Sequence, residues 1–552
     1  MTNSTPAFQR AVQLIGPDEL RLNSEKPVFK PGPHQLLCRV EVVGLCFSDL
    51  KLLKQFSTHV RKSEVVSGIS RDVLADVPNY VPGDLPTVPG HETVVRVVEV
   101  GEAVTGMRPG DRFIVQADWR WVRTDQSNAA FGYNFEGALQ EYVLLDLRVI
   151  TAPDGESMLL PAIEELAASA VALVEPWACV EDSYVSTERQ TLRPGGHLVV
   201  VSHSEEATAR AKEFLAAAPA PERISWIGAP PDGLRTERPD SLDRLPDESA
   251  DDLLFFGGDA DLLEKAFKKV AANGLVILVQ CGERFGRKVV TPVGRLHYGG
   301  VRVTGTPGDR PQDALEAIPA SGEIRAANRI NVVGAAGPMG TMHVIRNLCH
   351  GVDGISMVAG DMSDERLHAL ARVAEPLARA NGVEFKVYNA GTSPEAGPFD
   401  YTALLVPAPA LVDTAIGLSA PHAIINIFAG IPVTVYHPLD LDTFVERQLY
   451  FIGTSGSDMR DMKIVLGKVT SGSLDTNLSV AAISGLDGAV DGIRAVENQE
   501  MPGKIIVYPS CKGLPLTRLD LLHELHPDVA EKMDEGMWGR AAEAKLLEVY
   551  EG

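Results

Sequence analysis

A glycine-rich segment in the second half of the chain has the residue types and spacing that bind phosphates. Its sequence, VVGAAGPMG, follows a predicted strand and precedes the predicted helix TMHVIRNL. Gly334, Gly337 and Gly340 allow a tight turn, a close approach to a pyrophosphate, and packing of the helix on the strand. The N-terminus of that helix presents free N–H groups to phosphates, so the segment predicts a dinucleotide site, with a plain tight turn as the alternative. We expect the same site to include Pro338, Met339 and Arg366.

An acidic residue at the end of the next predicted strand indicates which dinucleotide binds. Asp361 ends the strand ISMVAGD, 27 residues after Gly334. A carboxylate at this place suits the two hydroxyls of an adenosine ribose and repels a 2′-phosphate. The sequence therefore favours NAD over NADP.

The strands and helices that position this site occur twice along the chain. Residues 253–282 can be aligned with residues 403–430, and the offset of 148 or 149 residues continues through the segments that follow. Strands that alternate with helices are typical of a parallel sheet. We interpret the repeat as two tandem copies of one doubly wound α/β domain, at 193–322 and 323–457.

The first copy lacks the residues that would bind the cofactor. Ser202, His203 and Ser204 stand where the glycines begin in the second copy. Ala229 and Pro230 stand where the acid would be. We predict a degenerate domain that keeps its scaffold and binds no dinucleotide.

Composition argues against several other classes of protein. The chain has 552 residues, enough for several domains, and a net charge of −23. Nucleic acids and anionic membranes both attract clustered Lys and Arg, so neither is expected as a partner. No apolar run is long enough to span a bilayer, and the N-terminus lacks the layout of a secretory signal. The six cysteines form no CxxC pair, and we predict a cytoplasmic protein without a disulfide framework.

Five motifs follow one another in the first third of the chain. They are VGLCFSDLK (43–51), PTVPGHETVVRVVEVG (86–101), PGDRF (109–113), GALQEYV (137–143) and ALVEPWAC (172–179). In this order they resemble the medium-chain zinc-dependent alcohol and polyol dehydrogenases, and the sorbitol dehydrogenase branch most closely. The resemblance covers residues 8–192 and 323–510.

The resemblance implies an α/β chain in four parts. A GroES-like, β-rich catalytic domain occupies 1–192, and a degenerate Rossmann-like domain occupies 193–322. An NAD-binding Rossmann domain follows at 323–457. The last part, 458–552, returns to the catalytic domain and ends in a helical tail.

The resemblance also implies a metal centre. Cys46 matches the family's thiolate ligand, His91 and Glu92 belong to its GHE motif, and Glu175 matches a glutamate at or near the metal. One sulfur, one imidazole nitrogen and carboxylates suit a tetrahedral zinc with one open position. Whether Glu92 or Glu175 is the third protein ligand stays open. A buried cysteine, a core histidine and a surface glutamate are the alternative interpretation.

The implied mechanism is hydride transfer. Zinc lowers the pKa of a substrate hydroxyl, and the alkoxide then expels a hydride to the nicotinamide. Ser48 is expected to hydrogen-bond the reacting oxygen and pass its proton on, and Asp49 is expected to orient a metal ligand. Lys51 stands where the family often has a proton-relaying histidine. It relays through the ribose, binds an anionic substrate group, or points to water.

Two further departures from the family are visible in the sequence. The stretch 113–137 has no cysteine, so the family's four-cysteine structural zinc is excluded there. The segment 54–86 is longer than the family's usual few residues, carries positive charge at His59, Arg61 and Lys62, and is expected to cover the active site. One further cluster has two interpretations: it stacks on and clamps a sugar or an acid, or it serves ordinary packing or a subunit contact. Its members are Trp119, Arg120, Trp121 and Tyr133.

We therefore expect a zinc-dependent, NAD-linked oxidoreductase of a polyol, a sugar or another secondary alcohol, with one catalytic zinc. A reductase of a phosphorylated or acidic sugar, a lyase or epimerase that retains NAD, and a nonenzymatic NAD-binding scaffold are the alternatives. The degenerate copy is expected to replace a subunit contact at a sheet edge, with a homodimer as the alternative. Two amphipathic helices, RLDLLHELHPDVAEKM and WGRAAEAKLLEVYEG, are expected to dock the C-terminal tail.

Overall fold

The computed structural model describes residues 5–454 and 456–551, and the chain divides into two compact units. The first unit comprises Met1–Ala178 and Ser457–Gly552, and the second comprises Cys179–Gly456. Among the described residues, no helix is long and apolar enough to cross a membrane. The domain boundaries that the sequence suggests at 192, 322 and 457 stay predictions.

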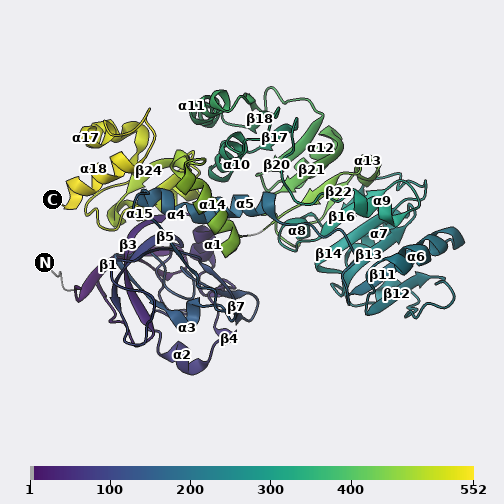
Figure 1. Ribbon diagram of the computed structural model, residues 1–552, viewed down its shortest axis with the longest axis horizontal. Coiled ribbons are helices and arrows are strands. Elements are labelled where there is room, and N and C mark those ends of the chain that lie inside the picture. Colours follow the sequence, from purple (N-terminus) through teal and green to yellow (C-terminus); the bar gives the residue numbers. More distant parts are fainter. Residues whose placement is uncertain (1–4, 455, 552) are drawn as a thin grey trace. The chain divides into compact units, whose positions relative to one another are not determined.

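The first unit is built on an eight-stranded sheet that joins both ends of the chain (Figure 1). The strand order is β10-β6-β5-β3-β25-β24-β26, and β9 also pairs with β3. The antiparallel pairing of β25 with β3 brings a C-terminal strand onto the N-terminal domain. The bounds are β3 (Gln35–Gly44), β5 (Glu92–Val100), β6 (Arg112–Val115), β9 (Tyr142–Asp146), β10 (Leu159–Pro161), β24 (Val480–Ser484), β25 (Lys504–Val507) and β26 (Thr517–Arg518).

Two small sheets and several helices complete the first unit. The strand β4 (Val65–Ser67) lies in the long segment 54–86 and pairs with β7 (Asp118–Thr124), which pairs with β8 (Asn128–Ala130). The long segment is therefore tied to the domain by strand pairing. The other elements are β1 (Phe8–Gly16), β2 (Glu19–Pro27), α1 (Phe47–Gln55), α2 (Arg71–Ala75), α3 (Leu147–Ile150), α4 (Ala168–Ala172), α14 (Met459–Ser471), α15 (Leu486–Glu497), α16 (Leu522–Leu525), α17 (Pro527–Ala530) and α18 (Arg540–Glu551).

The C-terminal tail differs from the two long helices that the sequence predicts. The first is broken into the short helices α16 and α17, and only α18 is long. The break falls at His526, whose backbone leaves the helical region directly before Pro527. Proline disfavours a helical conformation in the residue before it, which explains the break.

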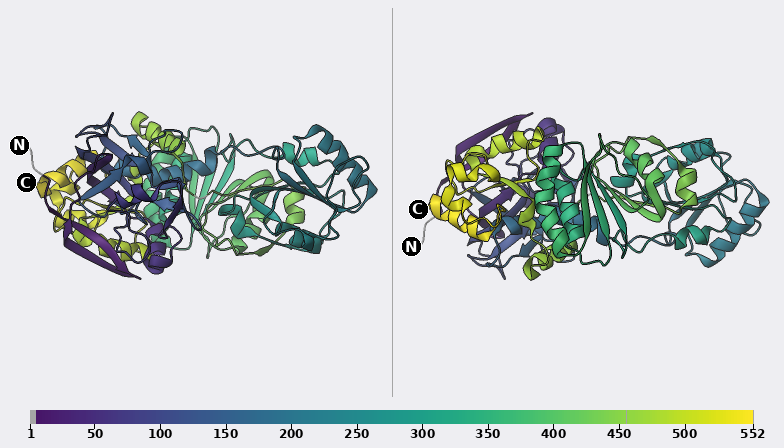
Figure 2. Two further views of the ribbon diagram at one scale, coloured as in Figure 1. Left: turned by 90° about the horizontal axis from the view of Figure 1, so that it is seen from below. Right: turned by 90° about the horizontal axis from the view of Figure 1, so that it is seen from above.

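The second unit holds two parallel sheets, as the repeat predicts (Figure 2). The first has the strand order β12-β11-β13-β14-β16, and the second has the order β19-β18-β17-β20-β21-β23. The bounds in the first copy are β11 (His197–Ser202), β12 (Arg223–Gly228), β13 (Ala250–Phe256), β14 (Val270–Val279) and β16 (Arg302–Thr306). Those in the second are β17 (Arg329–Val333), β18 (Ser356–Asp361), β19 (Glu384–Asn389), β20 (Phe399–Leu404), β21 (Ser419–Ile427) and β23 (Tyr450–Ile452).

Helices and one extra strand pair accompany these sheets. The strands β15 (Val289–Thr291) and β22 (His437–Leu439) form a two-stranded antiparallel ribbon that joins the two copies. Figure 2 shows α10 and α11 side by side against the second sheet. The helices are α5 (Val174–Val185), α6 (Glu205–Ala217), α7 (Ala260–Phe267), α8 (Val293–His297), α9 (Pro311–Glu316), α10 (Pro338–Leu348), α11 (Asp364–Ala380), α12 (Ala410–Leu418) and α13 (Leu441–Glu446).

The core of the second unit explains its strand composition. The strand β11, HLVVVS, is buried along its whole length, as expected for a parallel strand covered on both faces. One hydrophobic cluster contains Val276 and Leu278 of the first sheet together with Ile425 and Ile427 of the second. The two copies therefore share a core, and the prediction of two tandem parallel-sheet domains is confirmed.

Candidate metal centre and nucleotide-binding loop

Two neighbouring strands of the first unit position the predicted metal ligands. In the antiparallel pair β3 and β5, Gly44 lies opposite Glu92. Cys46 follows β3 by two residues and is the N-cap of α1, whereas His91 directly precedes β5. The end of one strand and the start of its partner therefore meet, and Cys46 and His91 lie close together although 45 residues separate them in the sequence.

The ligand atoms of Cys46, His91 and Glu92 lie within 4.8 Å of one another. Ser48 lies beside them, because its Oγ is 3.0 Å from Cys46 Sγ and 3.1 Å from His91 Nε2. Asp49 Oδ1 lies 3.1 Å from His91 Nδ1, and Asp49 Oδ2 accepts a bond of 3.2 Å from the backbone N–H of Cys46. An ionised carboxylate only accepts, so His91 Nδ1 carries a proton toward Asp49, and Nε2 is the ring nitrogen that would bind a metal in place of its own proton.

The negative groups around His91 favour a positive charge at this place. Burial lowers the pKa of His91, but the charges of Asp49 and Cys46 outweigh burial and raise that pKa well above its usual range. The same charges would attract a metal cation. This electrostatic arrangement agrees with the donor set of one thiolate, one imidazole and one carboxylate.

A buried lysine holds one oxygen of Glu92 and leaves the other without a partner. Lys504 Nζ, on β25, lies 2.6 Å from Glu92 Oε1 and donates a second bond of 2.6 Å to the carbonyl of Leu45. Glu92 is completely buried, and its Oε2 has no hydrogen-bond partner among the described residues. An unpartnered buried carboxylate oxygen is costly, so this atom fits a metal ligand.

Glu175, the fourth predicted metal residue, lies outside the three-residue cluster. It is on α5 and is buried. Burial raises the pKa of the Glu175 carboxyl to about 7, a shift that the charge of Glu92 increases and that of His91 opposes. The described structure therefore brings Cys46, His91 and Glu92 together and leaves Glu175 as a nearby carboxyl.

The long segment 54–86 and the aromatic cluster lie next to the same histidine. The Tyr133 ring is buried, with its centroid 5.9 Å from the ring of His91 and 5.1 Å from the ring of His59. Trp119 is also buried, and its indole N–H donates to the carbonyl of Gln116 at 3.0 Å. Lys51 is exposed on α1. Trp119 is thus packed in the domain, whereas Tyr133 is close to the candidate metal centre.

The predicted nucleotide loop has the backbone that phosphate binding needs. Gly334 has a φ of 81°, and a Cβ on Gly340 would lie 2.2 Å from the Gly334 carbonyl, so no other residue fits either position. Gly337 is the N-cap of α10, which has Pro338 in its first turn, no side-chain cap and no acidic residue there. Met339 follows Pro338 in this turn. The first N–H groups of α10 are therefore left for an anion.

The acid at the end of β18 is held by its surroundings. Asp361 Oδ1 accepts bonds from the backbone N–H of Met362 (2.8 Å) and from Arg366 Nη2 (2.6 Å). Its Oδ2 lies 3.3 Å from the backbone N of Ala336, inside the glycine loop. Arg366 Nε is buried without a hydrogen-bond partner among the described residues. Asp361 and Arg366 thus lie at the loop, and their role in binding the cofactor stays a prediction.

The first copy has a different strand-to-helix turn. Ser204 caps α6 by accepting from the backbone N–H of Ala207, and Glu205 and Glu206 fill the first turn. A capped helix end with two carboxylates repels a phosphate. Ser202 bonds to Thr208 at 3.0 Å, which closes the turn further.

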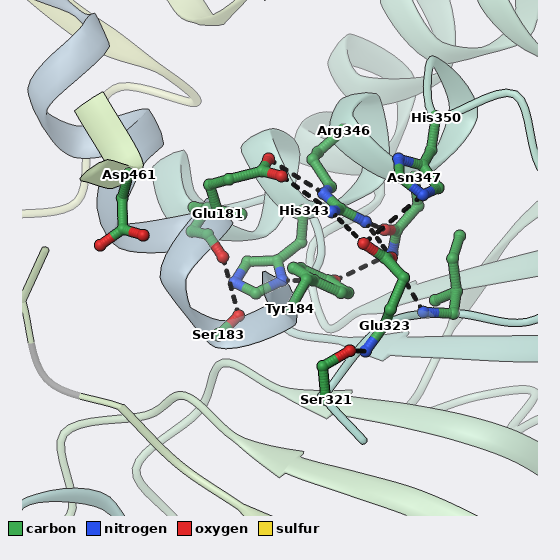
Figure 3. A network of polar contacts seen from close by, with 12 residues as sticks. Glu181, Ser183, Tyr184, Ser321, Glu323, His343, Arg346, Asn347, His350 and Asp461 are labelled. Carbon is green, nitrogen blue, oxygen red and sulfur yellow. Dashed lines mark hydrogen bonds and ion pairs between the residues drawn. The ribbon is translucent and has the colours of Figure 1, made fainter. Parts of the chain in front are cut away.

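The helix behind the glycine loop is fixed by a buried polar network (Figure 3). Arg346 of α10 pairs with Glu181 of α5 at 3.1 Å and with Glu323 at 2.6 Å. Tyr184 bonds to His343 Nδ1 at 2.8 Å and accepts from Asn347 at 2.9 Å. These contacts hold α10, and with it the phosphate-facing N-terminus, against α5.

Comparison with known proteins agrees with this architecture. Residues 32–154 match the alcohol dehydrogenase GroES-like domain. A stretch of 98 residues is 33% identical to the sorbitol dehydrogenase of Gallus gallus, covering 18% of this chain and 22% of that protein. These matches support assignment of the chain to the medium-chain dehydrogenase superfamily.

Two other relatives show how far the likeness extends. The uncharacterized protein YggP of Escherichia coli (strain K12) is 26% identical over 246 residues, which cover 41% of this chain and 57% of YggP. The chain thus spans less than two thirds of the length of these curated relatives. The structure of 2R,3R-butanediol dehydrogenase from Bacillus subtilis overlays with a TM-score of 0.53 and 14% identity, covering 91% of this chain and 99% of that chain. The overlay shows that the two chains share a fold.

Sequence reasoning missed two features of the site. Lys504 was not predicted, although it is a lysine at the start of the buried strand KIIV and could have been noticed for that reason. The network around Arg346 joins α5, α10 and the segment before β17, and no local motif identifies it. The predicted absence of a structural zinc in 113–137 stays a prediction.

Proposed function

We propose that the chain is a zinc-dependent, NAD-linked oxidoreductase that transfers a hydride between a polyol, a sugar or another secondary alcohol and NAD. The observation that carries the proposal is the cluster of Cys46, His91 and Glu92 with the Ser48 hydroxyl 3.0 Å from Cys46 Sγ. Relatives named sorbitol dehydrogenase and alcohol dehydrogenase support the substrate class. A cytoplasmic location stays a prediction.

Cys46, His91 and Glu92 would hold the zinc, and Glu175 is the alternative carboxylate. A zinc ion bound there supplies a Lewis acid that lowers the pKa of a coordinated hydroxyl. Asp49 orients His91 so that Nε2 would face the zinc, because Asp49 Oδ1 accepts from Nδ1 at 3.1 Å. Lys504 neutralises Glu92 and fixes the direction in which the free Oε2 points.

Ser48 is the group that would handle the substrate proton. Its hydroxyl is placed by the first turn of α1, two residues after the Cys46 cap, and lies between the sulfur and the imidazole. A serine hydroxyl both donates and accepts, so it can relay the substrate proton: its oxygen accepts that proton while its own hydrogen passes on toward solvent. Lys51 lies one helical turn further and is exposed.

The glycine loop and Asp361 support NAD as the cofactor. The uncapped N-terminus of α10 suits a pyrophosphate, and a carboxylate at the end of β18 suits ribose hydroxyls and repels a 2′-phosphate. Arg366 lies against Asp361 at 2.6 Å. A reductase of a phosphorylated or acidic sugar is the second candidate, because the positively charged Arg61 of segment 54–86 lies near Tyr133.

The proposal is tested by metal content and turnover in three proteins. We expect one zinc per wild-type chain and NADH formation with at least one member of a panel of polyols, sugars and sugar phosphates. Cys46→Ala is expected to lose zinc and turnover, whereas Cys281→Ala, a control in the second unit, is expected to keep both. If the wild-type chain showed neither zinc nor turnover, the proposed dehydrogenase activity would be refuted. The remaining interpretation would be a nonenzymatic NAD-binding scaffold.

A further inference from the structure

The segment 54–86 places an arginine beside the candidate active site. Arg61 Cζ lies 5.7 Å from the centroid of the Tyr133 ring, and the same ring is 5.9 Å from the ring of His91. One aromatic side chain thus contacts both the predicted metal ligand and the guanidinium. All three residues belong to the first unit, so their arrangement is internal to one body.

The backbone around Arg61 is held against the domain by strand pairing and hydrogen bonds. The segment that carries it pairs through β4 with β7. Lys62, which is completely buried, donates to the carbonyls of Val81 and Leu85. The Asn134 side-chain amide also bonds to the carbonyl of Ser63 at 3.2 Å. The residues on both sides of Arg61 are therefore fixed on the domain surface.

The guanidinium keeps donors for a ligand. Asp118 contacts Arg61 Nη2 at 3.2 Å, and this is the side-chain partner of Arg61 among the described residues. A guanidinium carries five N–H donors in a fork that matches phosphate and carboxylate oxygens. The Arg61 side chain is 33% exposed, so a ligand can reach the remaining donors.

The local charge around Arg61 is positive although the chain is strongly acidic. Asp118 also contacts Arg120 Nε at 3.3 Å. One carboxylate therefore balances the charge of two arginines. Burial, followed by the positive charges of Arg61 and Lys51, lowers the pKa of His59 to about 4. His59 is therefore neutral at pH 7, and Lys51 is close enough to add to the same field.

We propose that Arg61, with the charge of Lys51, binds an anionic group of the substrate, either a phosphate or a carboxylate, carried by the polyol or sugar. The inference rests on the proposed function of the same site. Arg61 is then a specificity-determining residue, and the role of segment 54–86 is to place it beside the substrate. The anion would lie near Tyr133, and the rest of the substrate would extend toward His91.

The test compares three ligands that share a six-carbon chain: sorbitol, sorbitol 6-phosphate and gluconate. Their binding to the zinc-loaded, full-length chain is measured by titration calorimetry at low ionic strength, with NADH present so that no ligand is oxidised. We expect the wild-type chain to bind at least one of the two anions more tightly than sorbitol. The preferred anion then identifies phosphate or carboxylate as the recognised group.

Substitutions then assign the preference to Arg61. Arg61→Gln is expected to lower the ratio of anion affinity to sorbitol affinity by about 10- to 100-fold, the effect of losing a charge-assisted hydrogen bond. Arg61→Lys is expected to restore part of the ratio, because it keeps the charge without the fork. Arg123→Gln, an exposed arginine on β7, is the matched control and is expected to keep the wild-type ratio.

Three results would overturn the inference. Equal affinity of the wild-type chain for sorbitol and both anions would remove the anion site. An equal loss for all three ligands in Arg61→Gln would assign the arginine a structural role. An unchanged ratio in Arg61→Gln would place the anion elsewhere. The proposed function fails separately, when the wild-type chain neither binds zinc nor reduces NAD with any member of the substrate panel.

Discussion

Val290 pairs with Pro438, the residue that stands 148 positions later in the chain and occupies the equivalent place in the second copy. In the same ribbon, Val289 lies opposite Leu439, and Thr291 lies opposite His437. A residue that pairs with its own counterpart lies on a two-fold axis. The ribbon of β15 and β22 therefore relates the two copies by an internal pseudo-two-fold.

Packing on either side of the ribbon follows the same symmetry. Gly305 packs so closely on Val445 that an added Cβ would lie 2.7 Å from that residue. Gly453 packs in the same way on His297, where an added Cβ would lie 2.8 Å away. Gly453 and His297 are the counterparts of Gly305 and Val445 at the offset of 148 residues. The copies thus meet as two subunits of a symmetric dimer would, inside one chain. We propose that this contact takes the place of a subunit interface.

A cysteine pair on the axis tests whether the contact lies within one chain. We expect Val290→Cys/Pro438→Cys to form a disulfide on oxidation, because residues that pair across antiparallel strands have Cα separations of about 4.5–5.5 Å. The cross-linked protein should keep the mass of a single chain on a non-reducing gel and by light scattering. Covalent dimers that form in the double variant but not in Val290→Cys would contradict an internal contact.

Loss of Lys504 should affect the metal centre through Glu92. Lys504→Met leaves the buried Glu92 carboxylate without its counter-charge. Breaking such a pair typically destabilises a protein by about 3–5 kcal/mol. We expect a lower unfolding temperature and weaker zinc binding. Lys463→Met removes an exposed lysine that contacts Glu156, and it should change neither property. Equal effects of the two variants would contradict the role given to Lys504.

The contact between Asp49 and His91 predicts a milder effect. Asp49→Asn keeps a side chain of the same size but removes the charge that orients the imidazole. We expect zinc affinity to fall by about 10- to 100-fold while the chain still folds. Competition with a chelator measures the affinity, and circular dichroism checks the fold. Zinc affinity equal to the wild-type value would show that His91 needs no such partner.

The sequence predicts those parts of the site that lie in short motifs. Cys46 and His91 were assigned because VGLCFSDLK and the GHE motif resemble motifs of a known family. The glycine loop was found from the spacing of Gly334, Gly337 and Gly340 between a strand and a helix, and the structure gives the steric reason for Gly334 and Gly340. The parallel sheets were predictable because strands such as β11 are apolar along their whole length. Local pattern and tertiary structure agree in these segments.

Other features depend on contacts between distant segments. Lys504 reaches Glu92 across more than 400 residues of sequence, through the pairing of β25 with β3. Arg61 meets Tyr133 because β4 pairs with β7. A charged residue in a strand or loop gives no signal for such partners until the sheet is assembled. The long-range partners of the site were therefore beyond sequence reasoning.

The buried His343 predicts how the second unit responds to acid. Burial, with the nearby charge of Arg346, lowers the pKa of His343 to about 3, whereas an unfolded histidine has a pKa of about 6.5. Its Nε2 has no hydrogen-bond partner among the described residues, so a proton added there would be poorly accommodated. Between these two pKa values the unfolded chain binds more protons than the folded chain.

Stability from this histidine is therefore present above about pH 6.5 and is lost as the pH falls toward 3. Between pH 7 and pH 5 the loss is about 2 kcal/mol. His343→Asn removes the titrating group. We therefore expect the drop in free energy of unfolding between pH 7 and pH 5 to be about 2 kcal/mol smaller in the variant than in the wild-type chain. The comparison uses the change with pH, because the substitution also disturbs the bond to Tyr184. Urea unfolding of both proteins at the two pH values gives the measurement. Parallel losses in the two proteins would show that His343 is not the group that titrates.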